Sequence, residues 1–308
     1  SWRGVSQGTM CTMDRVRLKV KWMQVVFFVV IALLIGGGLV LWMTSIRSCE
    51  KAGSYVPARM ADIPPGAWER LNRTKLFFGH HSVGRNILNG IADVMATYPS
   101  VRLRIVNTED AGQINEAILA HASVGRNFDP VSKIDEFERL MDSGLGEKVD
   151  IAFFKLCFVD IGIHSDPDAI VAAYGETMER LKQRYPETVF VHVTVPLGGP
   201  PGSAKGILKA SIKRLIGRPP VLAENRVRAR YNALLRERFA GNEPLFDLAL
   251  YETLGPEGQR YCSISDGQEV PILARMYTDD GGHLNARGRR HLAEQLLMEL
   301  LKLSEERE

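Results

Sequence analysis

Residues 149–159 read VDIAFFKLCFV, and almost every side chain in this stretch is apolar. A strand of this kind is buried on both faces, which is typical of the centre of a parallel sheet. Parallel neighbours are joined by crossover connections, usually helices. The stretch therefore predicts an α/β domain, with strands and helices alternating on either side of it.

The chain from residue 75 onward shows this alternation. Short apolar or alternating runs predict strands, and apolar residues three or four apart predict helices. The predicted strands are 75–80, 101–107, 149–159, 188–196 and 244–253. The predicted helices are 82–98, 131–143, 166–185, 221–240 and 286–304. We expect a doubly wound parallel sheet of about five strands with helices on both faces, and a site at the carboxyl ends of the strands.

Residues 25–43 read VVFFVVIALLIGGGLVLWM and contain no charged side chain. As a helix, this run is close to the length that crosses the hydrocarbon core of a bilayer. Trp22 and Trp42 bracket it at positions typical of the membrane interface. The alternative is a buried helix of a soluble domain, but such a helix usually keeps a polar face. The pattern predicts a transmembrane signal-anchor over 23–45.

The charges beside this segment predict its orientation. The basic residues that precede it are Arg15, Arg17, Lys19 and Lys21, and fewer positive charges follow it. The positive-inside rule then leaves 1–22 in the cytoplasm and the rest outside it, in the periplasm or the extracellular space. A cleaved signal peptide is the alternative, although its apolar region is usually shorter. Residues 46–74 contain several prolines and predict a linker or a wrap over the domain, which spans 75–308.

The composition is that of an ordinary globular protein. The net charge of the 308 residues is only +3, from 39 basic and 36 acidic side chains, so no nucleic-acid partner is expected. The four cysteines, Cys11, Cys49, Cys157 and Cys262, form no CxxC pair and no zinc spacing. Cys157 reads as a small buried apolar residue, or as the disulfide partner of Cys262 in an oxidising compartment.

A basic stretch lies in the Gly- and Pro-rich segment 197–220, which we expect to pass over the active face. Its members are Lys205, Lys209, Lys213, Arg214 and Arg218. Such a run is usually a solvated helix face. Contact with lipid head groups or with an anionic glycan is the alternative.

Ser82 lies between an apolar strand and a helix, in the sequence Phe78-Gly79-His80-His81-Ser82-Val83-Gly84. A serine there sits at a helix N-terminus, where the dipole and the free N–H groups stabilise an oxyanion. A plain N-cap serine is the alternative. The position predicts a nucleophile if a base is close by, because a serine hydroxyl is weak without one.

A second polar cluster, Thr278-Asp279-Asp280-Gly281-Gly282-His283-Leu284-Asn285, comes just before the last helix. Asp280 and His283 are three residues apart on a Gly-rich loop, so one short loop can present a base and the carboxylate that orients it. The alternative is a polar turn that caps the last helix through Asn285.

Together these clusters resemble the SGNH/GDSL hydrolases, over roughly Lys75 to the C-terminus. The resemblance implies a flavodoxin-like three-layer α/β/α fold and a catalytic triad of Ser82, Asp280 and His283. It also implies a Gly and an Asn as oxyanion donors beside the N–H of Ser82, and Gly125 and Asn127 in HASVGRNFDP are the candidates.

Two departures from the family pattern stand out. Gly79-His80-His81-Ser82 replaces the usual Gly-Asp-Ser, and Lys155-Leu156-Cys157-Phe158-Val159-Asp160 stands where Gly-x-Asn-Asp is usual. We expect His81 to line the substrate pocket and the other histidine to pack under the helix. A zinc set of His80, His81, Asp280 and His283 is the alternative, but the pair lacks helical i, i+4 spacing, and we expect neither metal nor cofactor.

The resemblance implies a serine esterase, most simply a deacetylase that acts on an acylated carbohydrate or another small ester. An O-acyltransferase shares this triad and passes the acyl group to a sugar. A non-catalytic binding module is the alternative from another class. The missing Asn-Asp favours that module, and the intact Asp-x-x-His opposes it.

Overall fold

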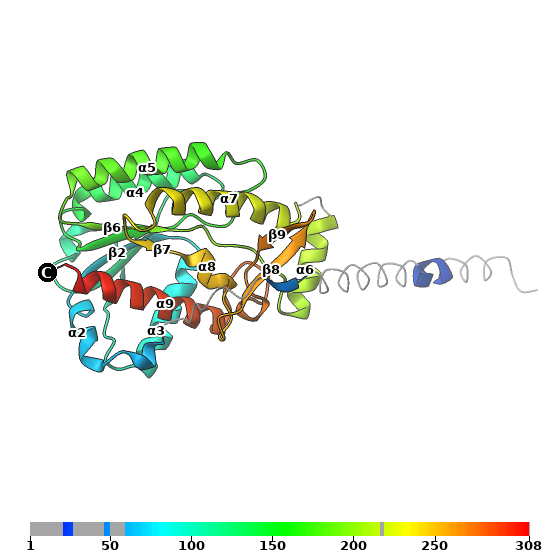
Figure 1. The fold of residues 1–308 in the computed structure, drawn as a ribbon, viewed down its shortest axis with the longest axis horizontal. Coiled ribbons are helices and arrows are strands. Elements are labelled where there is room, and N and C mark those ends of the chain that lie inside the picture. Colours follow the sequence, from blue (N-terminus) through cyan, green and yellow to red (C-terminus); the bar gives the residue numbers. More distant parts are fainter. Residues whose placement is uncertain (1–20, 27–45, 50–58, 216–218, 308) are drawn as a thin grey trace, which may run out of the picture. The chain divides into compact units, whose positions relative to one another are not determined.

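The computed structural model describes residues 21–26, 46–49, 59–215 and 219–307 (Figure 1). The chain divides into two compact units, Ser1–Ile46 and Arg47–Glu308. In the first unit, residues 21–26 are helical. Within the described ranges, no helix is long and apolar enough to cross a membrane. Most of the predicted transmembrane segment 25–43 lies outside these ranges, because residues 27–45 are not described.

The second unit is built on a six-stranded parallel sheet with the order β3-β4-β2-β5-β6-β7. The strands are β2 (Lys75–His80), β3 (Ile105–Asn107), β4 (Ile118–Ser123), β5 (Ile151–Phe154), β6 (Val189–Val193) and β7 (Leu245–Phe246). β2 and β5 are the two central strands, and nearly all of their residues are buried. This central position confirms the expectation drawn from the apolar stretch 149–159.

Helices cover both faces of the sheet. The α-helices of this unit are α2 (Trp68–Leu71), α3 (Val83–Thr97), α4 (Pro130–Leu140), α5 (Pro167–Arg184), α6 (Ala204–Leu215), α7 (Val221–Phe239), α8 (Leu248–Thr253) and α9 (Ala286–Glu305). α3 packs on α9 in one core, and α4, α5 and α7 form the other (Figure 1). The three-layer α/β/α architecture is therefore confirmed.

Capping residues fix where two predicted helices begin. The Asp166 carboxylate accepts a hydrogen bond from the Ala169 N–H, and Pro167 follows at the first helical position of α5. The Asn285 side chain accepts from the Gly288 N–H and starts α9. Both helices therefore begin where their polar N-caps predict.

The short helices and the residues before β2 complete this unit. The 3-10 helices are η1 (Met60–Asp62), η2 (Pro65–Ala67), η3 (Ala111–Gln113) and η5 (Arg275–Tyr277), and η4 (Met141–Leu145) is a π-helical turn. In the segment predicted to be a linker or a wrap, Trp68 and Leu71 are almost fully buried and join the core that α3 and α9 form.

A small separate sheet has the order β1-β8-β9, with β1 (Ile46–Cys49), β8 (Arg260–Ser265) and β9 (Gln268–Pro271). β8 and β9 form an antiparallel hairpin. Cys262 in β8 is disulfide-bonded, whereas Cys157 is a free, buried cysteine. The interpretation of Cys157 as a partner of Cys262 is therefore wrong, and its interpretation as a buried apolar residue is confirmed.

The sheet differs from the prediction in two places. β4 was not expected, so the main sheet has six strands rather than about five. The predicted strand 244–253 is a two-residue strand followed by α8, because Asp247 accepts from the Leu250 N–H and caps a helix there. The segment 197–220, which carries the predicted basic stretch, contains the helix α6.

Candidate active site

Ser82 occupies a strained turn between β2 and α3. Its backbone has φ 25° and ψ −86°, a conformation that non-glycine residues rarely adopt. The side chain makes no capping hydrogen bond, although Ser82 stands at the N-cap of α3. The plain N-cap interpretation is therefore wrong. Strain of this kind is often kept at functional sites, and here it leaves the hydroxyl uncommitted to the helix.

The strand register places the loops after β4 and β5 beside Ser82, at the same height along the strand direction. His80 pairs with Ser123 across β2 and β4, so Ser82 and Gly125 each lie two residues beyond a paired position. Gly79 pairs with Phe154 across β2 and β5, so Ser82 and Cys157 each lie three residues beyond one. The contact between Ser82 Oγ and Cys157 Sγ, 4.0 Å, agrees with this alignment. The loops after β4 and β5 thus flank the serine at the carboxyl edge of the sheet.

His81 fastens the β4 loop beside the serine. Its Nε2 lies 2.8 Å from the Val124 carbonyl oxygen and 3.1 Å from that of Gly125. Carbonyl oxygens only accept hydrogen bonds, so Nε2 carries the proton and donates to both. The imidazole predicted to line a substrate pocket thus holds the loop that carries Gly125.

The backbone conformation and the close packing at position 125 require a glycine. Its φ is +54°, and a Cβ there would meet the backbone of Ser132 and Lys133 on α4. Glycine is the residue that adopts this conformation without steric cost. Within the described part of the chain, the N–H groups of Ser82 and Gly125 make no hydrogen bond, so both donors are unused.

Asn127 is oriented by a buried lysine. The Lys133 ammonium lies 2.9 Å from Asn127 Oδ1. An ammonium has only donors, so the amide must turn its oxygen toward Lys133 and its NH₂ group away from it. Among the described residues no acceptor takes a hydrogen bond from that NH₂ group. The side chain therefore presents two unused N–H donors at the end of the β4 loop.

Lys133 also pairs with Asp160 at 2.6 Å, and both side chains are fully buried. The Asp160 carboxylate accepts from the Cys157 N–H at 2.6 Å and from the Phe128 N–H at 2.9 Å. Lys133 comes from α4, Phe128 from the β4 loop and Cys157 from the β5 loop. One buried ion pair therefore joins the two loops that flank Ser82.

Asp280 and His283 form a pair on the loop before α9. His283 Nδ1 lies 2.9 Å from Asp280 Oδ2, and Asp280 Oδ1 accepts from the N–H groups of Gly282 and His283. The hydrogen bond from the His283 ring, followed by these backbone N–H groups, holds the pKa of Asp280 well below its usual range. The carboxylate is therefore ionised at neutral pH and fixes the ring. His283 Nε2 makes no hydrogen bond to a described residue.

Two contacts bring this loop toward Ser82. The Leu284 N–H donates to Asn86 Oδ1 at 3.2 Å, and Asn86 lies one turn into α3 from Ser82. The ring of Phe158, next to Cys157, packs edge-on against His283 with centroids 5.7 Å apart. Among the described residues, no hydrogen bond joins Ser82 directly to His283. The three predicted triad residues are thus linked through their immediate neighbours.

The two adjacent histidines have different partners. His80 is buried under α3, where its ring meets Gly84, and its Nε2 lies 3.2 Å from His121 Nδ1. Burial, with the nearby His121, lowers the pKa of His80 to about 3, so this ring is neutral at pH 7. No group of three or more metal-ligating side chains gathers within the described ranges. The alternative zinc set is not assembled, because His80, His81 and His283 each face a different partner.

Two further ionisable groups are buried near the β5 loop, and the sequence did not indicate them. Lys155 is completely buried, its Nζ lies 3.4 Å from Cys157 Sγ, and burial lowers its pKa. Burial raises the pKa of Glu252 to about 8, and Glu252 Oε2 accepts from the Leu197 N–H. Cys157 thus lies in the β5 loop beside the buried amine of Lys155.

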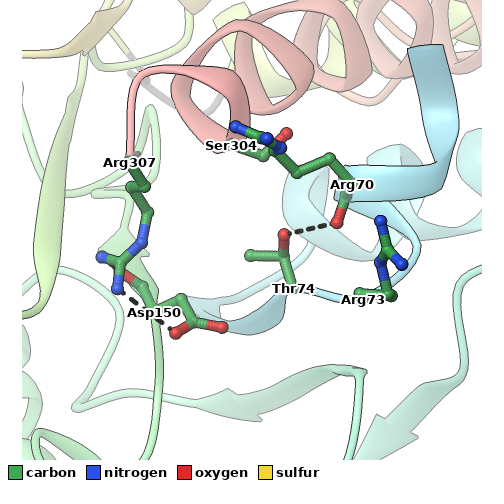
Figure 2. Close-up of a pocket in the computed structure, with 6 residues that line it drawn as sticks. All are labelled: Arg70, Arg73, Thr74, Asp150, Ser304 and Arg307. Atoms are coloured by element: carbon green, nitrogen blue, oxygen red, sulfur yellow. Dashed lines mark hydrogen bonds and ion pairs between the residues drawn. The ribbon is translucent and has the colours of Figure 1, made fainter.

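A cavity of about 260 Å³ lies at the opposite edge of the sheet (Figure 2). Thr74 and Asp150, which line it, immediately precede β2 and β5 and therefore mark the amino ends of the strands. Arg307 donates to the carbonyl oxygens of Asp150 and Glu187, both at 2.7 Å. These bonds tie the end of α9 to the sheet, so this cavity is far from the candidate triad in the fold.

No protein-family model matches the chain, and no curated protein matches it by sequence. Solved structures similar to it include a lipase/acylhydrolase from Enterococcus faecalis, with 15% identity, a TM-score of 0.42, and coverage of 74% of this chain and 96% of that one. A protein described as a GDSL-like lipase from Parabacteroides merdae has 13% identity, a TM-score of 0.42, and coverage of 76% and 99%. The periplasmic domain of a lipopolysaccharide acetyltransferase from Salmonella ser. Paratyphi A has 12% identity, a TM-score of 0.38, and coverage of 75% and 84%. At identities this low, the function must rest on this chain's own residues.

Proposed function

We propose that this protein is a serine esterase that removes acyl groups, such as acetyl, from a carbohydrate or another small ester. The observation that carries the proposal is the state of Ser82: a strained serine whose hydroxyl makes no capping bond to the helix and lies 4.0 Å from Cys157 Sγ, flanked by unused N–H donors. A serine that only capped α3 would spend its hydroxyl on the helix and would not need the strained turn.

In the first step, Ser82 Oγ attacks the ester carbonyl and its proton passes to His283 Nε2. Asp280 keeps Nδ1 protonated and stabilises the imidazolium that forms. The oxyanion is stabilised by the N–H groups of Ser82 and Gly125 and by the side-chain amide of Asn127. The approach of Ser82 Oγ to His283 Nε2 that this requires, about 3 Å, is often reached only in the substrate complex.

The intermediate then collapses, and the alcohol leaves with the proton from His283. Water attacks the acyl-serine and gives a proton to His283. The bond between the acyl group and Ser82 Oγ then breaks, His283 returns the proton to Oγ, and the carboxylic acid leaves. If a sugar hydroxyl takes the place of this water, the same residues perform O-acyl transfer. The acceptor is therefore the difference between the two enzymatic alternatives, and the chemistry of the triad is common to both.

A fluorophosphonate probe tests the proposal, because it labels only activated serines. We expect the full chain to be labelled at Ser82, and Ser82→Ala to lose both labelling and hydrolysis of a chromogenic acetyl ester. Ser143→Ala is the matched control, since Ser143 is an exposed helical serine that bonds only the Leu140 carbonyl. A folded chain without labelling would favour the non-catalytic binding module. Labelling with transfer to an added sugar, and little hydrolysis, would identify an acyltransferase.

We further propose that 23–45 anchors the protein in a membrane and that the domain lies on the non-cytoplasmic side, in the periplasm or the extracellular space. The charge-free run 25–43 and the preceding basic residues support the anchor. The disulfide at Cys262 supports an oxidising compartment. A reporter fused after Glu308 that functions only when exported should be active, and activity only from a cytoplasmic reporter would reject this orientation.

A further inference from the structure

The helix α6 has one exposed face that combines aliphatic and basic side chains. Lys205, Leu208, Lys209 and Ile212 follow the spacing i, i+3, i+4, i+7, which places them on one side of a helix. Leu208 is 58% exposed and Ile212 is 51% exposed, although aliphatic side chains of this size are more often buried. Lys205 and Lys209 are exposed beside them.

The other side of α6 is fixed to the loop that carries the triad. The Ser203 N–H and hydroxyl both donate to the Asp279 carbonyl oxygen, at 3.2 and 2.9 Å. Gly206 is buried against the same carbonyl, with no room for a Cβ. The Gly199 N–H donates to the Gly281 carbonyl oxygen at 2.9 Å. Whatever α6 docks on is therefore held beside Asp280 and His283.

The charges along the sequence segment that contains α6 have one sign. No acidic residue occurs between Glu187 and Glu224, while the same stretch contains three lysines and two arginines from Lys205 to Arg218. Figure 1 shows α6 at the end of the domain opposite the C-terminus. The helix thus presents a cationic, partly aliphatic surface at the catalytic end of the domain.

We propose that this face of α6 docks on the surface of an anionic phospholipid bilayer. The lysines would lie among the head groups, with their stems along the interface, while Leu208 and Ile212 enter the acyl boundary. An anionic glycan would satisfy the lysines equally well, but it would leave the two aliphatic side chains in water. The combination on one face therefore favours lipid. Docking would turn the Asp280–His283 loop toward esters carried at the membrane surface.

Photocrosslinking of the full chain in vesicles tests this surface without depending on catalysis. A benzophenone amino acid would be incorporated at position 208, at 212 or, as a matched control, at Glu176, which is an exposed position of α5. The vesicles would be phosphatidylcholine alone, or phosphatidylcholine with about one-third phosphatidylglycerol. We expect several-fold more lipid adduct from 208 and 212 than from 176, and only where the anionic lipid is present. The control position corrects for any general proximity that residues 25–43 impose.

The double variant Lys205→Gln/Lys209→Gln should lower the adduct yield at 208 by roughly fivefold for each lysine removed. Its hydrolysis of a soluble ester should be unchanged, which separates this docking surface from the triad. Equal yields at 176 and 208, or no lipid adduct in either vesicle, would overturn the proposal. Loss of the adduct to an added anionic polysaccharide, with no dependence on the lipid charge, would assign the surface to glycan and overturn it as well.

Discussion

Two acid–base pairs belong to the candidate site around Ser82, and they differ most in their access to water. Lys133–Asp160, at 2.6 Å, joins the loops after β4 and β5, and both side chains are 0% exposed. Asp280–His283, at 2.9 Å, lies on the loop before α9, with the side chains 37% and 48% exposed. Each pair holds one part of the candidate site in place.

The difference shows two uses of a charged pair near a serine: one fixes the loops, and the other orients the base. A fully buried pair loses its hydration, and the loss is offset only if further hydrogen bonds satisfy the charges. Asp160 has such bonds from Cys157 and Phe128, and Lys133 has one to Asn127, so the geometry of three segments depends on the pair. The exposed pair contributes little to stability but leaves the imidazole open to substrate.

The largest effect is expected from the exposed pair, in the rate rather than in the fold. Asp280→Asn keeps an oxygen for the Gly282 and His283 N–H groups but no longer holds the imidazole in the right tautomer. In serine hydrolases this change lowers kcat by up to about 10⁴. Steady-state kinetics on a soluble ester should show that loss, while His283→Ala should be more severe because it removes the base itself.

The urea midpoint of Asp280→Asn should stay close to that of the unaltered chain. Asp62→Asn is a suitable control, since Asp62 also forms an exposed pair with a residue three positions away, Arg59, and neither belongs to the candidate site. It should change neither the rate nor the midpoint. A normal kcat in Asp280→Asn would remove the carboxylate from the mechanism.

The second effect is expected from the buried pair, in the fold. Lys133→Met fills a similar volume but leaves the Asp160 carboxylate buried without a counter-charge, which costs about 3–5 kcal/mol. Equilibrium unfolding in urea measures this loss. The double variant Lys133→Met/Asp160→Asn removes the uncompensated charge and should recover part of it. If Lys133→Met costs less than about 1 kcal/mol, the pair is not what holds the loops together.

This contrast also explains what the sequence could predict. The Asp280–His283 pair lies within four consecutive residues, so its hydrogen bond is local and the spacing alone indicates it. Lys133 and Asp160 are 27 residues apart, and only the fold brings them together. One local signal was available: Lys133, Phe137 and Leu140 share the apolar face of α4, where an unpaired lysine is not expected.

The predicted strands overlap β2, β3, β5, β6 and β7, but most of their bounds were inaccurate and β4 was missed. β2 has the predicted bounds, but β5 ends at Phe154 although apolar residues continue to Val159. Leu156 and Cys157 are buried in the site loop, so their apolar character reports burial rather than strand. β4 was missed because His121 interrupts its short apolar run, and burial of His121 against His80 depends on a partner from β2.

The third effect is expected at Asn127, whose side chain connects the buried Lys133–Asp160 pair to the proposed oxyanion site. Asn127→Asp would keep the contact with Lys133, now as a second carboxylate near the ammonium, but it replaces the N–H donors by a negative charge. Removing one oxyanion donor costs about 10²–10³ in kcat. We expect at least that loss, with KM little changed. Asn127→Ala should show a similar loss, and retention of full kcat in both variants would exclude Asn127 as a donor.

The smallest effect is expected from His80, which is buried under α3, and this effect depends on pH. The folded-state pKa of His80, about 3, lies below its ordinary value of 6.5, so the unfolded chain binds the proton more readily. The contribution of His80 to stability is therefore largest above pH 6.5 and falls as the pH drops below that value, by about 2 kcal/mol at pH 5. Glu252, whose pKa burial raises to about 8, changes stability in the opposite direction over this range, so the measurement is a comparison of variants. Between pH 7.5 and pH 5, urea unfolding should show that the unaltered chain loses more stability, or gains less, than His80→Gln. His164→Gln is the matched control, because His164 is exposed and its replacement should leave the pH response unchanged. The same pH response in His80→Gln as in the unaltered chain would mean that the buried ring of His80 does not contribute to the acid sensitivity of the fold.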